Sequence, residues 1–179
     1  MIKINITKIT LAQIITVLIF LLSFENYAQN QSIDSSANIV TSEDLEIILG
    51  EWTGSLTYID YGSNKPYTMP ANLSVKKGKN KNQLLLYNIY PNEPKANSKD
   101  KITLSKKGDR LNNKMIISRE KLSNGQVQIT TEYFGKDNNK KATIRNIYLL
   151  GKNQFIIKKE VRFENSDEWL KRNEYNFKR

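Results

Sequence analysis

The sequence contains no cysteine and no histidine among its 179 residues. The absence of cysteine excludes disulfide bonds, thiol nucleophiles, cysteine-ligated metals and lipidation at a cleavage-site cysteine. The absence of histidine removes the commonest general base, any Ser-His-Asp triad and the commonest metal ligand. A carboxylate site built on Asp60, Glu132 or Glu160 is disfavoured, because carboxylates on adjacent strands usually pair with lysine on the solvent face. We therefore expect a protein that is not an enzyme and that needs no metal or other cofactor.

Long apolar runs are also scarce, and the one that is present lies near the start. Its apolar core is residues 11–24. Lys3 and Lys8 precede this core, and the small residue Ala28 follows it. The core is shorter than the ~20 residues needed to span a bilayer, so it predicts a secretory signal peptide over residues 1–28; the alternative is a retained membrane anchor. No second run of this length follows, so we expect no transmembrane segment in the mature chain. The predicted localisation is periplasmic or secreted, in a bacterium.

The chain is basic, with 28 Lys and Arg residues against 18 Asp and Glu residues. Residues 75–81 concentrate this charge at a predicted hairpin tip. Such a cluster attracts anionic envelope surfaces, whereas the alternative is a turn that only aids solubility. Aromatic residues do not alternate with these lysines, so no nucleic-acid partner is predicted.

Three segments are expected after the signal peptide. Residues 29–40 are rich in Gln, Asn and Ser, which is typical of a disordered leader. Residues 41–49 predict a short helix, with Thr41 or Ser42 as its N-cap and Gly50 as its terminator. Residues 41–179 are expected to form a single domain, of which this helix is the first element.

From Trp52 onward the apolar pattern has a period of two, which indicates β-strands. Turn sequences rich in Gly and Asn separate the strands, and Asn124-Gly125 is the strongest hairpin signal among them. A meander must close or cover its edges. We therefore predict an all-β, antiparallel up-and-down barrel of about eight or nine strands with a short N-terminal helix; a β-sandwich is the alternative. The expected strands are residues 52–61, 68–76, 83–90, 101–107, 114–121, 126–134, 141–150, 154–163 and 168–177.

The segment Leu49-Gly50-Glu51-Trp52 stands at the start of the first predicted strand. It resembles the Gly-x-Trp signature of the lipocalins and their bacterial lipocalin-like relatives. In that family the tryptophan closes one end of the barrel and packs against an arginine of the last strand. The resemblance therefore implies a closure built from Gly50, Trp52 and Arg172, with Arg179 just beyond that strand.

Polar residues on the predicted strands are candidates for the lining of such a barrel. Tyr58 and Asp60 share a face of the first strand with Trp52, although Tyr58 as core and Asp60 as a solvated strand end is the alternative. Arg145 lies in an otherwise apolar strand, where an inward side chain suits a carboxylate or phosphate and an outward one is solvated. The candidate ligand-binding residues are Tyr58, Asp60, Tyr87, Tyr133, Arg145 and Tyr148, with the apolar part of the ligand near Leu56, Leu73, Leu85 and Ile129.

Two functions follow from these patterns. The first is an exported lipocalin-like protein that binds a small apolar or amphipathic ligand inside the barrel. The alternative is a non-catalytic envelope interaction or structural module whose barrel is filled by its own side chains.

Overall fold

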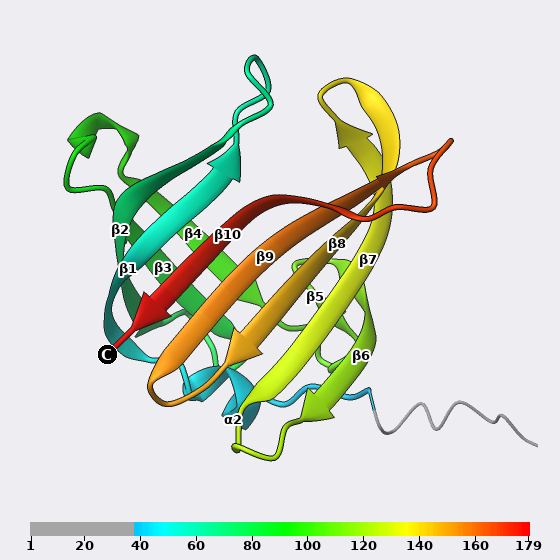
Figure 1. The fold of residues 1–179 in the computed structure, drawn as a ribbon. Coiled ribbons are helices and arrows are strands. Elements are labelled where there is room, and N and C mark those ends of the chain that lie inside the picture. The colour runs from blue at the N-terminus through cyan, green and yellow to red at the C-terminus, as the bar shows by residue number, and fades with distance from the viewer. Residues whose placement is uncertain (1–37) are drawn as a thin grey trace, which may run out of the picture. The chain divides into compact units, whose positions relative to one another are not determined.

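The computed structural model describes residues 38–179. The predicted signal peptide and most of the predicted leader lie outside these residues. The described part of the chain contains a short helix, α2 (Ser42–Glu46), a 3-10 turn, η1 (Pro94–Ala96), and ten strands (Figure 1). Neither helical segment in this range is long and apolar enough to cross a membrane. The strands are β1 (Gly50–Ile59), β2 (Pro66–Lys77), β3 (Gln83–Ile89), β4 (Ser98–Thr103), β5 (Arg110–Leu111), β6 (Lys114–Lys121), β7 (Val127–Asp137), β8 (Lys140–Leu150), β9 (Gln154–Phe163) and β10 (Leu170–Lys178).

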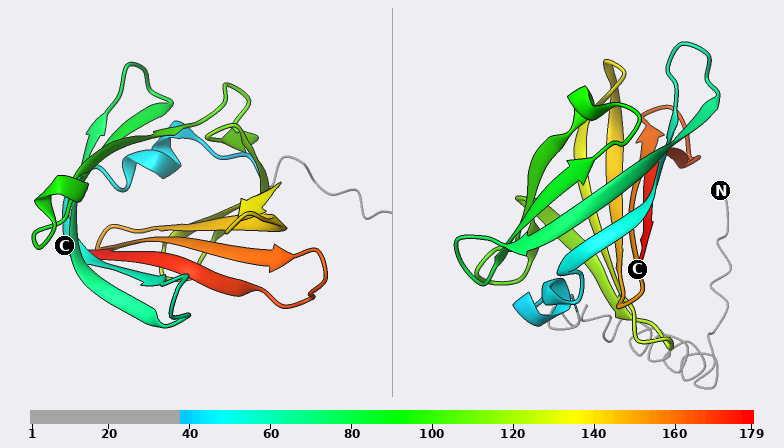
Figure 2. Two further views of the ribbon diagram at one scale, coloured as in Figure 1. Left: turned by 90° about the horizontal axis from the view of Figure 1, so that it is seen from above. Right: turned by 90° about the vertical axis from the view of Figure 1, so that its left-hand side faces the viewer.

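The strands form one sheet in the order β4-β3-β2-β1-β10-β9-β8-β7-β6-β5. All pairs are antiparallel, and the pairing of β1 with β10 joins the first strand to the last. The sheet therefore curls into an up-and-down barrel, as the view from above shows (Figure 2). The remaining gap lies between β4 and β5, where Leu104 and Leu111 form a single bridge. The barrel is nearly closed.

The predicted all-β up-and-down barrel with a short N-terminal helix is confirmed, and the sandwich alternative is excluded by the single continuous sheet. The strand count is ten rather than eight or nine. The additional strand is β5, whose two residues are too few to produce a periodic pattern. In addition, β4 spans Ser98–Thr103, so it begins and ends earlier than the predicted strand of residues 101–107.

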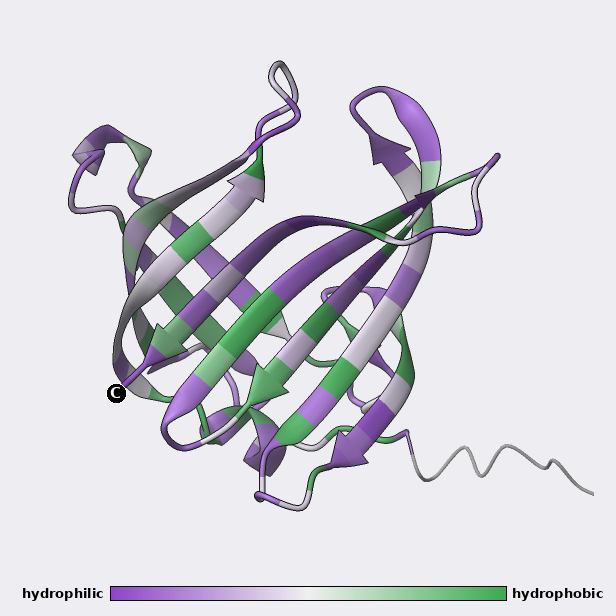
Figure 3. Cartoon of the chain, viewed as in Figure 1, coloured by the Kyte–Doolittle hydropathy of each residue, from purple (hydrophilic) through white to green (hydrophobic). Residues whose placement is uncertain are grey.

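The strand register arranges the inward-facing residues in rows across the barrel. The interior changes from apolar in the first row, through phenolic and aliphatic in the second, to largely polar in the third. The same trend along β9 and β10 is visible in their hydropathy (Figure 3). The first row contains Ala71, Gly54, Phe177, Phe155, Leu150 and Val127; the second contains Met69, Leu56, Tyr175, Ile157, Tyr148 and Ile129; the third contains Tyr67, Tyr58, Asn173, Lys159, Asn146 and Thr131.

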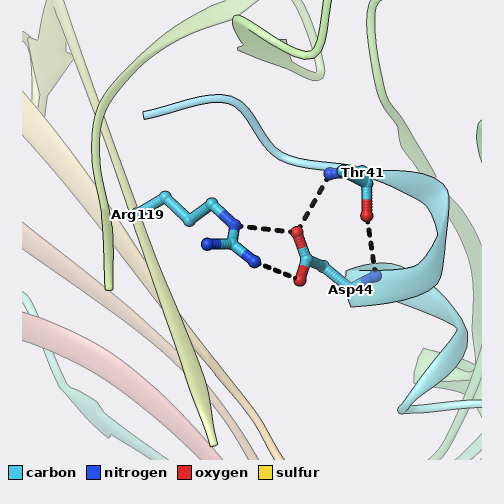
Figure 4. Close-up of polar contacts among 3 residues, drawn as sticks. All are labelled: Thr41, Asp44 and Arg119. Carbon is cyan, nitrogen blue, oxygen red and sulfur yellow. Dashed lines mark hydrogen bonds and ion pairs between the residues drawn. The ribbon is translucent and has the colours of Figure 1, made fainter. Parts of the chain in front are cut away.

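We call the end of the barrel that α2 covers the closed end. Helix α2 starts there in a capping box: the Thr41 hydroxyl accepts from the Asp44 N–H, and the Asp44 carboxylate accepts from the Thr41 N–H at 3.0 Å. Asp44 also accepts from Arg119 on β6, through Nε at 2.9 Å and Nη2 at 2.7 Å (Figure 4). Burial raises the pKa of Asp44, but the bonds from Arg119 and Thr41 outweigh burial and hold this pKa below its usual value. An ion pair thus ties the helix to the sheet.

The residues just before α2 also pack on the barrel. Val40 is buried, and its N–H donates to the Gly108 carbonyl at 3.0 Å. The side-chain oxygen of Asn38 accepts from the Arg119 main-chain N–H at 3.2 Å. The prediction of disorder up to residue 40 is therefore wrong for residues 38–40, where a buried valine and two hydrogen bonds order the chain.

Candidate functional site

Trp52 fills the closed end, as expected, but Arg172 is not its partner. The Trp52 ring is buried, packs edge-on against Phe155, and donates its Nε1–H to the Ile48 carbonyl at 2.8 Å. The guanidinium that covers this ring belongs to Arg179, with Cζ 4.1 Å from the ring centroid. Gly50, at φ +115°, lies directly beside Arg179, where an added Cβ would meet Nη1 at 3.0 Å.

The expected role of Arg172 is corrected by the antiparallel pairing of β1 with β10. Thr53 lies opposite Lys178, so the residue that follows β10 reaches Trp52. Arg172 is near the other end of β10, beside Asn173, which lies opposite Tyr58. It therefore belongs to the opposite end of the barrel.

We call that opposite end, at the hairpin turns of residues 60–65, 138–139 and 164–169, the open end. Its centre is Asp137, the last residue of β7, whose side chain is only 1% exposed. Lys159 donates from Nζ to Asp137 Oδ1 at 2.7 Å, the Tyr61 hydroxyl donates to the same oxygen at 2.8 Å, and Arg172 donates from Nε to Oδ2 at 2.7 Å. Four segments of the chain meet at this carboxylate.

Burial alone would raise the pKa of Asp137. The hydrogen bonds from Lys159 and Tyr61 and the positive charges of Lys159 and Arg172 outweigh burial, so the pKa lies below its usual value. Asp137 is therefore ionised at neutral pH, and it fixes the positions of two cationic side chains.

Aromatic rings hold the guanidinium of Arg172 in addition to Asp137. Its Cζ lies 4.8 Å from the ring centroid of Tyr61 and 5.7 Å from that of Phe163. The register of β10 shifts between Lys171 and Asn173, which places Arg172 at an irregularity of the strand. The side chain is 11% exposed, and what remains accessible lines a pocket.

This pocket, of about 330 Å³, lies at the open end between β1 and β10. Its volume is at the lower limit for small-molecule sites. Tyr175 is held there by a 2.7 Å hydrogen bond with the Tyr90 hydroxyl and by stacking on Phe177 at 5.7 Å. Tyr58 packs against Tyr67, with ring centroids 5.4 Å apart. The lining residues are Leu56, Tyr58, Ile59, Asp60, Tyr61, Arg172, Asn173 and Tyr175.

Four of the six predicted ligand residues lie on the interior face or at the pocket. Tyr58 and Asp60 line the pocket, and Asp60 Oδ1 accepts from the Ser63 N–H and hydroxyl, both at 2.7 Å, which shapes the turn. Tyr133 and Tyr148 face the interior farther round the barrel. Burial raises the pKa of Tyr148 to about 12. Leu56, Leu73 and Ile129 also face inward, and Leu73 and Ile129 are fully buried core.

The prediction that Tyr87 and Leu85 line the interior is wrong, because both lie on the outer face of β3. The Tyr87 ring lies between Lys76 and Lys99, at 5.4 and 5.0 Å. Arg145 also points outward, which was the alternative for this residue. Its Nε donates to Glu132 at 2.7 Å, and its Cζ lies 3.9 Å from the Trp169 ring.

Of the residues that meet at Asp137, only Arg172 was named by the sequence analysis, and for a different role; Tyr61, Asp137 and Lys159 were not predicted. Asp137 precedes Asn138 and Asn139, which adopt positive φ in a tight turn, so the segment looks like a turn sequence. One signal was available: Asp137 is in phase with the inward residues Val127 and Ile129 of the same strand. Lys159 is likewise in phase with Phe155 and Val161 on β9.

The fold defines the chain as an all-β, up-and-down, nearly closed barrel of ten strands with one short N-terminal helix in its described part. No family model and no curated protein matches the sequence. The solved structures that resemble it include Rv2717c from M. tuberculosis, with a TM-score of 0.46 and 8% identity over 79% of this chain and 98% of that one. Another is a protein of unknown function from the DUF3598 family of Nostoc punctiforme, with a TM-score of 0.37 and 12% identity over 79% of this chain and 49% of that one. At these identities no ligand or activity carries over.

Proposed function

We propose that the barrel binds a small apolar or amphipathic molecule in the pocket at its open end. In this proposal the chain is an exported, lipocalin-like binding protein of the periplasm or the exterior that acts without catalysis or a cofactor. The basic hairpin of residues 75–81 would then bring it to anionic envelope surfaces. The observation that carries the proposal is the pocket of about 330 Å³ beside Leu56, Tyr58 and Tyr175.

The contrast along the barrel axis supports this site. At the closed end, Trp52, Phe155 and Phe177 are 0–2% exposed and leave little apolar surface to cover. At the open end, Leu56, Tyr58 and Tyr175 are only partly buried, although they pack against the same core. Covering such apolar surface is favourable by about 25 cal/mol per Å². The phenol rings add polar atoms that can orient a bound molecule.

The test is a fluorescence titration with the neutral, environment-sensitive dye N-phenyl-1-naphthylamine. We expect saturable binding to the wild type and an affinity at least about fivefold lower for Tyr58→Ala, which removes one wall of the pocket. The matched control is Tyr87→Ala, because Tyr87 is a half-buried tyrosine on the outer face. Equal loss in both variants, or no saturable binding to a folded wild type, would contradict the proposal.

One observation favours the filled-barrel alternative. The hydrogen bond between Tyr90, which directly follows β3, and Tyr175 on β10 crosses the interior, so the barrel is not hollow along its length. If the folded protein binds no dye, an envelope interaction module that acts through its charged hairpins becomes the better account.

A further inference from the structure

Three arginines of the barrel besides Arg172 donate hydrogen bonds through at least two of their guanidinium nitrogens. At the closed end, Arg119 donates through Nε and Nη2 to Asp44. Arg179 donates through all three nitrogens to main-chain carbonyls of Ile47, Leu49 and Lys152. On the outer face, Arg145 donates through Nε and Nη2 to Glu132. Each of these arginines has a structural partner that accounts for its fork of donors.

Arg172 differs from them. It is 11% exposed, against 25% for Arg119 and 28% for Arg145, yet it donates only through Nε. Within residues 38–179, neither of its Nη atoms has a hydrogen-bond partner. The fully buried side-chain atoms without a partner in this range are the hydroxyls of Thr103 and Thr131, so the Nη atoms are not sealed off. The Nη atoms therefore keep some solvent access, on a side chain that lines the pocket.

We propose that the Nη groups of Arg172 bind the carboxylate of an amphipathic ligand whose apolar part lies against Leu56, Tyr58 and Tyr175. This proposal rests on the proposed function, because it names the chemical class of the molecule in the same pocket. In the free protein these N–H groups can bond only to water, and a carboxylate oxygen replaces that water with a charge-assisted hydrogen bond. The planar fork of a guanidinium matches the two oxygens of a carboxylate.

The guanidinium is held ready for such a ligand. Asp137 fixes Nε at 2.7 Å, while Tyr61 and Phe163 lie against the group at 4.8 and 5.7 Å. A side chain that is already ordered loses little conformational entropy when it binds. The β10 irregularity beside Arg172 positions it toward the pocket instead of within a regular ladder.

The charges around the pocket disfavour more than one negative charge on the ligand. Arg172 and Lys159 are positive, whereas Asp137 and Asp60 are negative, so their formal charges cancel. Asp60 lines the same pocket and disfavours a second negative charge nearby. We therefore expect a carboxylate to bind better than a phosphate monoester, which carries ~1.5–2 negative charges at neutral pH.

The experiment compares octanoate with 1-octanol as competitors of N-phenyl-1-naphthylamine on the wild-type protein at neutral pH. The two molecules share their apolar chain and differ in the charged group. We expect octanoate to bind roughly tenfold or more tightly, because hydrogen bonds to charged groups contribute about 1.5–3 kcal/mol. Octyl phosphate serves as the third competitor, and we expect it to bind more weakly than octanoate.

The variant Arg172→Lys tests the assignment. Lysine keeps a positive charge beside Asp137, so the fold is preserved while the Nη fork is removed. We expect octanoate binding to fall to the level of octanol, with octanol binding unchanged. Arg145→Lys is the matched control on the outer face and should alter neither.

The outcomes separate the two proposals. If neither competitor displaces the dye and the dye itself does not bind, the proposed function fails. If octanol and octanoate bind equally to the wild type, the pocket stands and the carboxylate assignment is overturned. Tighter binding of octyl phosphate than octanoate also overturns it, in favour of a phosphate ligand. Loss of octanoate binding in Arg145→Lys as well as Arg172→Lys would mean that the preference does not come from the Arg172 fork, and would overturn the assignment.

Discussion

The closed end and the open end each bury an aspartate that pairs with an arginine, but the two pairs differ. At the closed end, Arg119 meets both oxygens of Asp44 with Nε and Nη2, and the Asp44 carboxylate also accepts from the Thr41 N–H. At the open end, Asp137 accepts from Arg172 through Nε alone and shares its other oxygen with Lys159 and Tyr61. In the first pair both donating nitrogens of the arginine have carboxylate partners, whereas the second leaves the Nη donors of Arg172 without a partner within residues 38–179, on a side chain that lines a pocket.

This difference indicates which end of a barrel that is partly filled by its own side chains can bind a ligand. A satisfied ion pair that joins helix α2 to strand β6 stabilises the closed end. An arginine with unused hydrogen-bond donors beside the half-buried Tyr58 and Tyr175 indicates a binding site at the open end. Substitutions at the closed end should therefore lower stability, and substitutions around the pocket should change binding more than stability.

The largest expected effect is at Trp52. We expect Trp52→Ala to lower the free energy of unfolding by about 3–5 kcal/mol, because the ring is fully buried. Urea denaturation monitored by circular dichroism measures this. Trp169→Ala is the control, since Trp169 is only partly buried against Arg145 and Arg162 on the outer face. Equal losses in the two variants would remove the distinction between core and surface tryptophan.

A smaller loss is expected at Asp44, which joins α2 to β6. Asp44→Ala removes the capping box and leaves Arg119 without its buried partner, so we expect a loss of about 2–4 kcal/mol. Its neighbour Glu43 is exposed, and Glu43→Ala is expected to cost far less in the same urea denaturation. A similar cost for both would mean that only the helix dipole is affected, and not the tie to the sheet.

The corresponding substitution at the open end is Asp137→Asn, with an expected loss of about 2–3 kcal/mol at pH 7 because Lys159 and Arg172 lose their shared counter-ion. The pKa of Asp137 is lowered in the folded state, so its stabilisation is present above the unfolded value of ~3.9 and is lost as the pH falls through the folded pKa. The gap between wild type and variant should therefore be constant from about pH 7 to 5 and should shrink below about pH 4.

The control for this series is Asp167→Asn in the exposed turn before β10. Its stability should follow that of the wild type at every pH. A gap between wild type and Asp137→Asn that stays constant down to the acid limit would contradict the lowered pKa. A gap that widens on acidification would mean that the pKa of Asp137 is raised in the folded state and not lowered.

The smallest effect is expected at Arg179. Arg179→Gln should lower the free energy of unfolding by about 1 kcal/mol, because the side chain is exposed while it covers Trp52 and bonds to main-chain carbonyls. Lys178→Gln changes the same charge one residue earlier and should have no measurable effect. If Arg172→Gln instead of Arg179→Gln exposed the Trp52 indole to fluorescence quenchers, the closure would belong to Arg172 after all.

Much of the fold could be predicted from the sequence because strand pairing follows from local patterns. The period of two and the Gly and Asn turns predicted β6 and β9 with their observed bounds. The two-residue strand β5 was not predicted because it is too short to show an alternating apolar pattern. The sequence pointed to Arg172 and not Arg179 as the partner of Trp52 because the register of the strands was unknown. The partner of Trp52 depends on where antiparallel β10 ends, and no local pattern specifies that.

The candidate site was harder to predict because its residues come together only in three dimensions. Tyr61, Asp137, Lys159 and Arg172 are separated in sequence. The first three look like ordinary turn or surface residues, and Arg172 was assigned to the opposite end of the barrel. Phase along the strand would have indicated that Asp137 and Lys159 point inward. The free Nη groups of Arg172 depend on which partners the fold leaves to it, and a sequence does not record that.

The most direct test of the proposed carboxylate site is a ¹⁵N–¹H NMR titration of the wild-type protein with octanoate. We expect shifts of the main-chain amides of Leu56, Tyr58 and Tyr175 and of the Arg172 Nε–H, with the indole N–H of Trp52 unchanged. Shifts centred on Tyr87 at the outer face, or a spectrum that does not change at saturating octanoate, would contradict it.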